Sequence, residues 1–139
     1  MKTSKEGRGA IGVREGRRNK AYLDTKGIPT IGVGHTGPEV HIGLVWTDQQ
    51  IDDALQADLK TAEDCINKYV TVPLAQNQFD ALASFIFNIG VGAFRRSTAL
   101  RLLNEKLYDM VPAAMLMWNK PKEIIGRRES EARQFDGIR

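Results

Sequence analysis

The sequence predicts an α+β fold, with a small β lobe near its start, a larger helical lobe and a long helix joining the two. Residues 22–36 alternate β-branched residues with turn residues, and residues 47–70 repeat apolar side chains at helical spacing. The chain after residue 74 keeps mainly helical spacing. We therefore expect a single domain over residues 1–139, with a β lobe at about 15–46 and a helical lobe at about 74–139 that includes the N-terminal segment. The cleft between two such lobes is a natural place for a ligand.

The β lobe is predicted from a short stretch of strand-forming residues around a reversal of the chain. Thr25, Lys26 and Gly27 form a good turn, and Ile28 and Ile31 follow in a strand-like segment. We expect a small hairpin or a three-stranded sheet that ends near residue 44. A sheet of this size must pack against helices to be stable.

The joining helix is the best defined element. Thr47 and Gln50 match a capping box, in which a hydroxyl cap is followed three residues later by an amide. After this cap, apolar residues recur at steps of three or four, and the helix should end before Pro73. This apolar stripe is formed by Ile51, Leu55, Leu59, Ala62, Ile66 and Tyr69.

Four shorter helices are predicted after the joining helix. The first should run from Gln76 to Ile89 and end at Gly90 and Gly92. The others are expected near residues 97–107, 109–119 and 127–136, and Pro121 closes the second of these three.

Composition excludes several classes of protein. Hydrophobic residues make up 42% and charged residues 27%, which is typical of a folded globular chain. No apolar run is long enough to cross a bilayer, so we expect no stable membrane insertion. No apolar segment follows the basic start, so we expect no signal peptide and synthesis in the cytoplasm. The one cysteine, Cys65, cannot form an internal disulfide and is expected to be an inert buried thiol.

The positive charge is concentrated near the N-terminus. Residues 1–20 contain seven Lys or Arg against two Glu, whereas the whole chain has a net charge of +3. A basic end indicates either an anionic polymer as partner or a solvated surface with no partner. Nucleic acid is disfavoured because no basic stripe interleaved with aromatic residues is present. Nothing in the sequence demands more than a monomer.

Glu15 and Asp24 are candidate catalytic carboxylates. Glycosidases use one protonated acid for the leaving oxygen and one ionised carboxylate on the other side of the bond. Thr30, across the turn from Asp24, could hold a water with its hydroxyl. Among 17 acidic residues this pair is a weak signal by itself, and two solvated surface carboxylates would give the same spacing.

The surrounding residues strengthen that interpretation. The segment from Glu15 to Thr36 closely resembles the signature of the phage-type lysozyme, or endolysin, family, whose catalytic spacing Glu-x8-Asp-x5-Thr falls here on Glu15, Asp24 and Thr30. Further motifs of that family follow in order, namely Pro73-Leu74, Asn77-Gln78-Phe79-Asp80, Phe87-Asn88-Ile89-Gly90, Ser97-Thr98, Trp118-Asn119 and Arg127-Arg128-Glu129.

The resemblance implies a lysozyme-like fold and hydrolysis of the β-1,4 bond between N-acetylmuramic acid and N-acetylglucosamine in peptidoglycan. Glu15 would be the general acid, while Asp24 and Thr30 would position water or stabilise the transition state. Relatives of this type mostly invert, which requires carboxyl groups roughly 6.5–9.5 Å apart. The enzyme would act on the cell wall after release from the host cytoplasm.

The resemblance also implies roles for residues outside the catalytic group. Thr36, Phe87, Asn88 and Ser97 are expected to contact the glycan. His35 is expected to tie the hairpin to a carboxylate, and Arg127 resembles the arginine that pairs with the catalytic Glu. No metal or organic cofactor is needed, because no ligand cluster is present.

Two departures from the family pattern concern the segment before Glu15. Gly7, Gly9 and Gly12 should each weaken a helix there by about 1 kcal/mol relative to alanine. Arg17 and Arg18, with Arg14, place positive charge around Glu15.

Two rival functions remain. One is a lytic transglycosylase, which needs an acid but no positioned water, so that Asp24 and Thr30 argue against it. The other is a catalytically weak cationic protein that binds the cell wall through its basic end.

Overall fold

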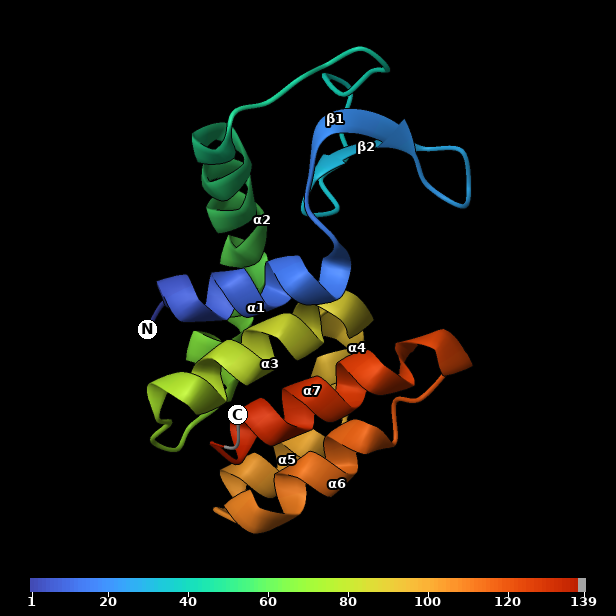
Figure 1. The fold of residues 1–139 in the computed structure, drawn as a ribbon. Helices are drawn as coiled ribbons and strands as arrows, with labels where there is room; N and C mark the ends of the chain where they lie inside the picture. Colours follow the sequence, from blue (N-terminus) through green and yellow to red (C-terminus); the bar gives the residue numbers. More distant parts are fainter. Residues whose placement is uncertain (138–139) are drawn as a thin grey trace. The chain divides into compact units, whose positions relative to one another are not determined.

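The computed structural model describes residues 1–137, which form two compact units (Figure 1). One unit comprises residues 8–58, and the other comprises residues 1–7 together with the chain from residue 59 onward. The division falls inside the long helix α2 (Asp48–Tyr69) and inside the first helix α1 (Lys5–Glu15), rather than at the ends of elements. The expected β lobe thus gains most of α1 and the first half of α2.

In the unit 8–58, strands β1 (Arg18–Leu23) and β2 (Pro29–Gly32) form an antiparallel pair. Tyr22 lies opposite Thr30, and the register shifts between Arg18 and Tyr22. Of the two expected arrangements the hairpin forms, and in place of a third strand there is a single bridge between Lys20 and Val45. The buried apolar residues of this unit are Ile11, Ile31, Val33, Val40, Ile51 and Leu55.

Helix α2 begins with the predicted capping box. The backbone N–H of Gln50 donates to Thr47 Oγ1 at 3.2 Å, and the backbone N–H of Thr47 donates to the side-chain oxygen Oε1 of Gln50 at 2.8 Å. Five members of the predicted apolar stripe are buried, and the sixth, Tyr69, is half-buried. Both the start of this helix and its buried face are therefore confirmed.

The helical unit contains α3 (Gln76–Ile89), α4 (Val91–Arg95), α5 (Thr98–Asn104), α6 (Val111–Leu116) and α7 (Ile125–Phe135). The bounds of α3 match the predicted ones. Two other predicted helices are shorter than expected: residues 105–107 lie outside α5, and residues 108–110 form a 3-10 turn before α6. Helix α4 was not predicted, because Gly90 and Gly92 indicated only the end of α3.

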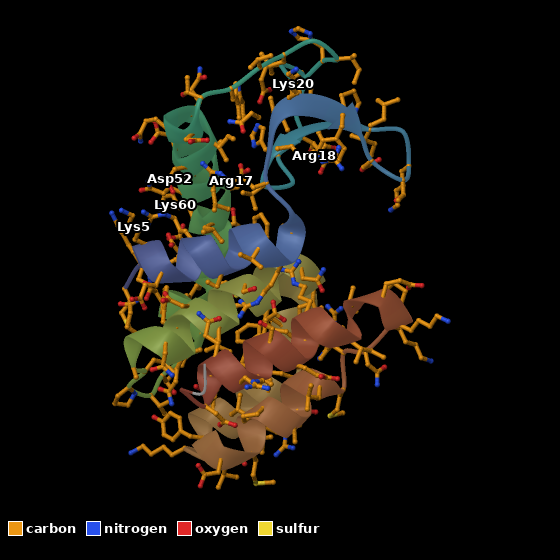
Figure 2. All side chains as sticks on the ribbon, in the orientation of Figure 1. Lys5, Arg17, Arg18, Lys20, Asp52 and Lys60 are labelled. Atoms are coloured by element: carbon orange, nitrogen blue, oxygen red, sulfur yellow. The ribbon has the colours of Figure 1, made fainter. Side chains whose placement is uncertain are left out.

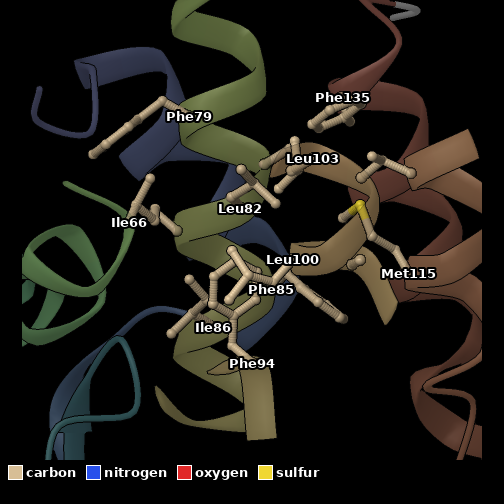
Figure 3. Packing of buried hydrophobic residues seen from close by; sticks show 14 of the residues in the cluster. Ile66, Phe79, Leu82, Phe85, Ile86, Phe94, Leu100, Leu103, Met115 and Phe135 are labelled. Carbon is tan, nitrogen blue, oxygen red and sulfur yellow. The ribbon is translucent and has the colours of Figure 1, made fainter. Parts of the chain in front are cut away.

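The core of the helical unit is built around α3. Leu82, Phe85 and Ile86 pack there with apolar side chains from the following helices, namely Phe94, Leu100, Leu103, Met115 and Phe135 (Figure 3). The Phe85 and Phe94 rings meet edge to face with their centroids 6.3 Å apart. Of the helices within residues 1–137, none has both the length and the apolar character needed to cross a membrane.

Candidate active site

Glu15 is the last residue of α1 and is half-buried. The helix stops there because Gly16 takes a left-handed conformation, with φ of 85°, and donates its N–H to the Gly12 carbonyl at 2.9 Å. The Glu15 carboxylate lies beside Gly34, where an added Cβ would come within 3.5 Å of Glu15 Oε2. Gly34 also has a positive φ, of 66°, so this position favours glycine because of its backbone conformation.

Asp24 follows β1 and closes the hairpin loop with its side chain. Asp24 Oδ1 accepts hydrogen bonds from the backbone amides of Lys26 and Ile28, each at 2.8 Å. The second oxygen, Oδ2, receives no hydrogen bond from residues 1–137. The carboxylate is thus held through one oxygen while the other remains open to a ligand or water.

Thr30 lies in β2 and is buried. Its hydroxyl donates to the Ile28 carbonyl at 2.8 Å. Because the hydroxyl proton is used in this bond, Oγ1 offers its lone pairs as acceptors. Glu15, Asp24 and Thr30 all belong to the unit 8–58, on α1, the hairpin loop and β2.

Two arginines expected to add charge around Glu15 have other partners. Arg17 Nη2 lies 3.4 Å from Asp48 Oδ1 and also donates to the Asp48 carbonyl at 3.2 Å. The Arg18 guanidinium stacks on the Tyr22 ring, 4.4 Å from its centroid. Arg17 precedes β1, Arg18 and Lys20 lie within it, and all three are exposed (Figure 2).

His35 lies between two carboxylates. Its Nδ1 is 2.6 Å from Asp58 Oδ2, and its Nε2 is 2.7 Å from Glu39 Oε1. Both neighbours belong to the unit 8–58, so His35 joins the turn after β2 to helix α2 and to the following loop. Thr36 comes next and is exposed.

The remaining predicted site residues lie in the helical unit. Phe87 is half-buried and Asn88 is exposed, both in the last turn of α3. Ser97 is buried and caps α5: its Oγ accepts from the Leu100 amide at 3.1 Å and donates to the Phe94 carbonyl at 2.7 Å. This capping role was not anticipated from the sequence.

Arg127 lies at the start of α7. Its Nε donates to Glu131 Oε2 at 3.1 Å, and its Nη2 donates to the Ser84 carbonyl at 3.0 Å. Glu131 and the neighbouring Arg128 are fully buried, and Arg128 donates to Asn88 Oδ1. Sequence reasoning gave neither of them a role. Glu131 follows Arg128 by three residues and Arg127 by four on one helix, and this spacing was the available signal for ion pairs.

Comparison with known proteins identifies the family. The model of the phage lysozyme family matches residues 13–131, which is most of the chain. The chain belongs to the phage lysozyme family. The endolysin of Salmonella phage P22 is 46% identical, and the match covers 97% of this chain and 98% of that protein. The endolysin of Bacillus phage PZA is 38% identical, but this chain spans only 55% of its length.

Solved structures of phage lysozymes and their relatives share the fold. A variant of P22 lysozyme superposes with a TM-score of 0.92 at 45% identity, over 97% of this chain and 98% of that one. The muramidase domain of SpmX from Asticaccaulis excentricus gives a TM-score of 0.87 at 37% identity, over 96% and 97% of the two chains. The predicted α+β lysozyme-like fold class is confirmed. In the part of the chain described, no three His, Cys, Asp or Glu side chains gather as a metal site.

Proposed function

We propose that this chain is an endolysin that hydrolyses the β-1,4 bond between N-acetylmuramic acid and N-acetylglucosamine in peptidoglycan. Glu15 donates a proton to the leaving oxygen as general acid, and the ionised Asp24 acts on the other side of the bond. Thr36, Phe87 and Asn88 contact the glycan. The enzyme reaches the cell wall after release from the host cytoplasm, acts as a monomer and needs no cofactor.

The single observation that carries this proposal is the way Asp24 and Thr30 are held. Two amides fix Asp24 through Oδ1, which leaves Oδ2 as an acceptor, and the Thr30 proton is already donated to a carbonyl. In the proposed mechanism, one water donates a hydrogen bond to Asp24 and a second to Thr30. Its own lone pair then points at the sugar, as an attacking nucleophile requires.

The same arrangement argues for hydrolysis over transglycosylation. A lytic transglycosylase closes the sugar on its own hydroxyl and needs no positioned water, so a paired Asp24 and Thr30 would have no use there. A catalytically weak cell-wall binder would need neither residue. Inversion at the anomeric carbon is the expected outcome, because a water held opposite the acid attacks from the far face.

The test compares the native chain with Glu15→Gln and Asp24→Asn on outer-membrane-permeabilised cells, followed by turbidity. Asparagine can still accept both amide bonds through its oxygen, so the hairpin loop is kept while the charge is lost. Loss of the acid should reduce the rate by about 10²–10⁴-fold. The matched control is Glu123→Gln, an exposed glutamate distant in sequence from the hairpin, which should clear cells like the native chain.

Mass spectrometry of digested peptidoglycan identifies the reaction. Reducing ends of N-acetylmuramic acid support a muramidase, whereas 1,6-anhydro ends would show a transglycosylase. Equal clearing by the native chain and Glu15→Gln would refute the assignment of Glu15 as the acid.

A further inference from the structure

Buried charged side chains of α7 form a cluster with Ser84 of α3, and one of them bonds directly to Asn88. Arg128, Glu131 and Ser84 are all fully buried. Each terminal nitrogen and the Nε of Arg128 has a partner: Nε donates to the Trp118 carbonyl at 2.9 Å, Nη1 to Glu131 and Nη2 to Asn88 Oδ1. An arginine without solvent contact and with all three nitrogens bonded has one fixed orientation.

The other members of the cluster hold Arg128 in place. Glu131 Oε2 accepts from Ser84 Oγ at 2.5 Å and from Arg127 Nε at 3.1 Å, so this carboxylate is anchored independently of Arg128. The Arg128 guanidinium also lies 5.0 Å from the centroid of the Phe85 ring. Ser84 and Asn88 are one helical turn apart on α3, so the cluster connects α7 to the end of α3.

The contact with Arg128 determines which way the Asn88 amide faces. A guanidinium can only donate hydrogen bonds, so the amide must turn its oxygen toward Arg128 and its NH2 group away. Asn88 itself is exposed, which leaves that NH2 group at the surface. The side chain therefore presents two donors outward and keeps its acceptor inward.

We infer that Arg128 is a positioning residue that orients Asn88 so that its amide NH2 group donates to an acceptor of the glycan. This inference rests on the proposed function, in which Asn88 contacts the sugar chain. Acetamido carbonyl oxygens are the strong neutral acceptors of peptidoglycan glycan, and they fit an NH2 group held in one direction. Without Arg128 the amide rotates, and each binding event must then order it again.

Steady-state kinetics on soluble peptidoglycan fragments test this with Asn88→Ala, Arg128→Met and the double variant. The contact between Asn88 and glycan is one hydrogen bond, so Asn88→Ala should raise KM about 5–10-fold with little change in kcat. Arg128→Met should raise KM in the same direction. In the Asn88→Ala background Arg128→Met should have no further effect on KM, because it acts only through Asn88.

Two further variants separate positioning from folding. Leu103→Ala opens a cavity in the core of the same unit, on α5 and outside the Arg128 cluster, so it should lower thermal stability but leave KM unchanged. Asn88→Asp keeps an oxygen for Arg128 but has no NH2 group, so it should raise KM like Asn88→Ala while the fold stays intact. If Arg128→Met does not fold, Arg128→Lys replaces it, since a lysine retains a charge for Glu131 but has a single terminal nitrogen.

Additive effects of Arg128→Met and Asn88→Ala on KM would overturn the inference, and so would a normal KM for Asn88→Asp. Failure of the proposed function has a different signature. In that case Glu15→Gln keeps native activity or the products carry 1,6-anhydro ends, whatever the Asn88 variants show.

Discussion

His35 Nδ1 and Asp58 Oδ2 lie 2.6 Å apart, and Glu39 Oε1 approaches the other ring nitrogen at 2.7 Å. Burial alone would lower the pKa of His35, but its hydrogen bonds to Glu39 and Asp58 outweigh that effect and raise the pKa above 6.5. The hydrogen bond to His35 lowers the pKa of Glu39 below its usual 4.5. The imidazolium form is therefore favoured by folding.

The first prediction is a stability maximum between about pH 4.5 and 6.5. A raised His35 pKa contributes stability that is complete below 6.5 and is lost as the pH rises through the folded value. A lowered Glu39 pKa contributes stability that is complete above 4.5 and is lost as the pH falls through the folded value. Thermal unfolding should show this for the native chain.

The variant Asp58→Asn isolates the pair. A hydrogen bond to a charged group contributes about 1.5–3 kcal/mol, so this variant should lose roughly that much near pH 5.5 and clearly less near pH 9. Equal losses at the two pH values would show that the charge on His35 has no part in the effect. Asp53→Asn, on the same helix, is a control that leaves His35 alone.

The second prediction separates two glycines of α1. The sequence gave Gly7 and Gly9 the same weakening effect on the helix, but their surroundings differ. A Cβ on Gly9 meets nothing within 4 Å, so Gly9→Ala should stabilise the chain by up to about 1 kcal/mol. A Cβ on Gly7 would lie 2.5 Å from Asp80 Cγ, so Gly7→Ala should destabilise it.

Asp80 cannot move away from Gly7 without loss. It is buried and accepts from the Ser4 amide at 2.9 Å and from the Ser4 hydroxyl, and Ser4 in turn caps the start of α1. Urea unfolding of both variants measures the two effects. A stabilised Gly7→Ala would mean that this packing is looser than the structure shows.

Elements with local signals were predictable from the sequence. The hydrogen bonds between Thr47 and Gln50 join residues that are only three apart in sequence. Helix α3 ends at Gly90, a residue type that commonly ends helices. Helix α4 was missed because Gly90 and Gly92, on either side of Val91, indicate the end of a helix. The buried Phe94 ring stabilises this short helix. That ring packs on Phe85, so the reason for the helix is tertiary.

The candidate site likewise contains residues that the sequence could predict and residues that only tertiary packing brings together. The positions of Glu15, Asp24 and Thr30 came from a resemblance over many residues, since the carboxylate spacing alone was weak. The contact between Arg128 and Asn88 joins residues 40 apart in sequence, and only the packing of α7 on α3 brings them together. Asn88 could be proposed from its motif, but the side chain that orients it could not.

The third prediction concerns Cys65, which is 4% exposed. Burial raises the pKa of the Cys65 thiol, and the nearby Arg95 charge opposes this only in part. A thiol that is both covered and protonated reacts slowly. Native protein should therefore react with a thiol reagent no faster than it unfolds, and rapidly in guanidinium chloride. Fast labelling without denaturant would contradict the inert role expected from the sequence.

The last prediction decides between two roles for Ser97. The resemblance placed this residue on the glycan, whereas the structure shows a buried hydroxyl that caps α5 with one bond given and one accepted. Loss of such a cap costs about 1 kcal/mol, so Ser97→Ala should lower the free energy of unfolding by that amount. Ser97→Asp still accepts from the Leu100 amide and should recover part of it, although it buries a charge. We expect KM to stay at the native value in Ser97→Ala, because the hydroxyl proton is already committed to Phe94. A KM raised several-fold in Ser97→Ala at unchanged stability would instead place this hydroxyl on the substrate.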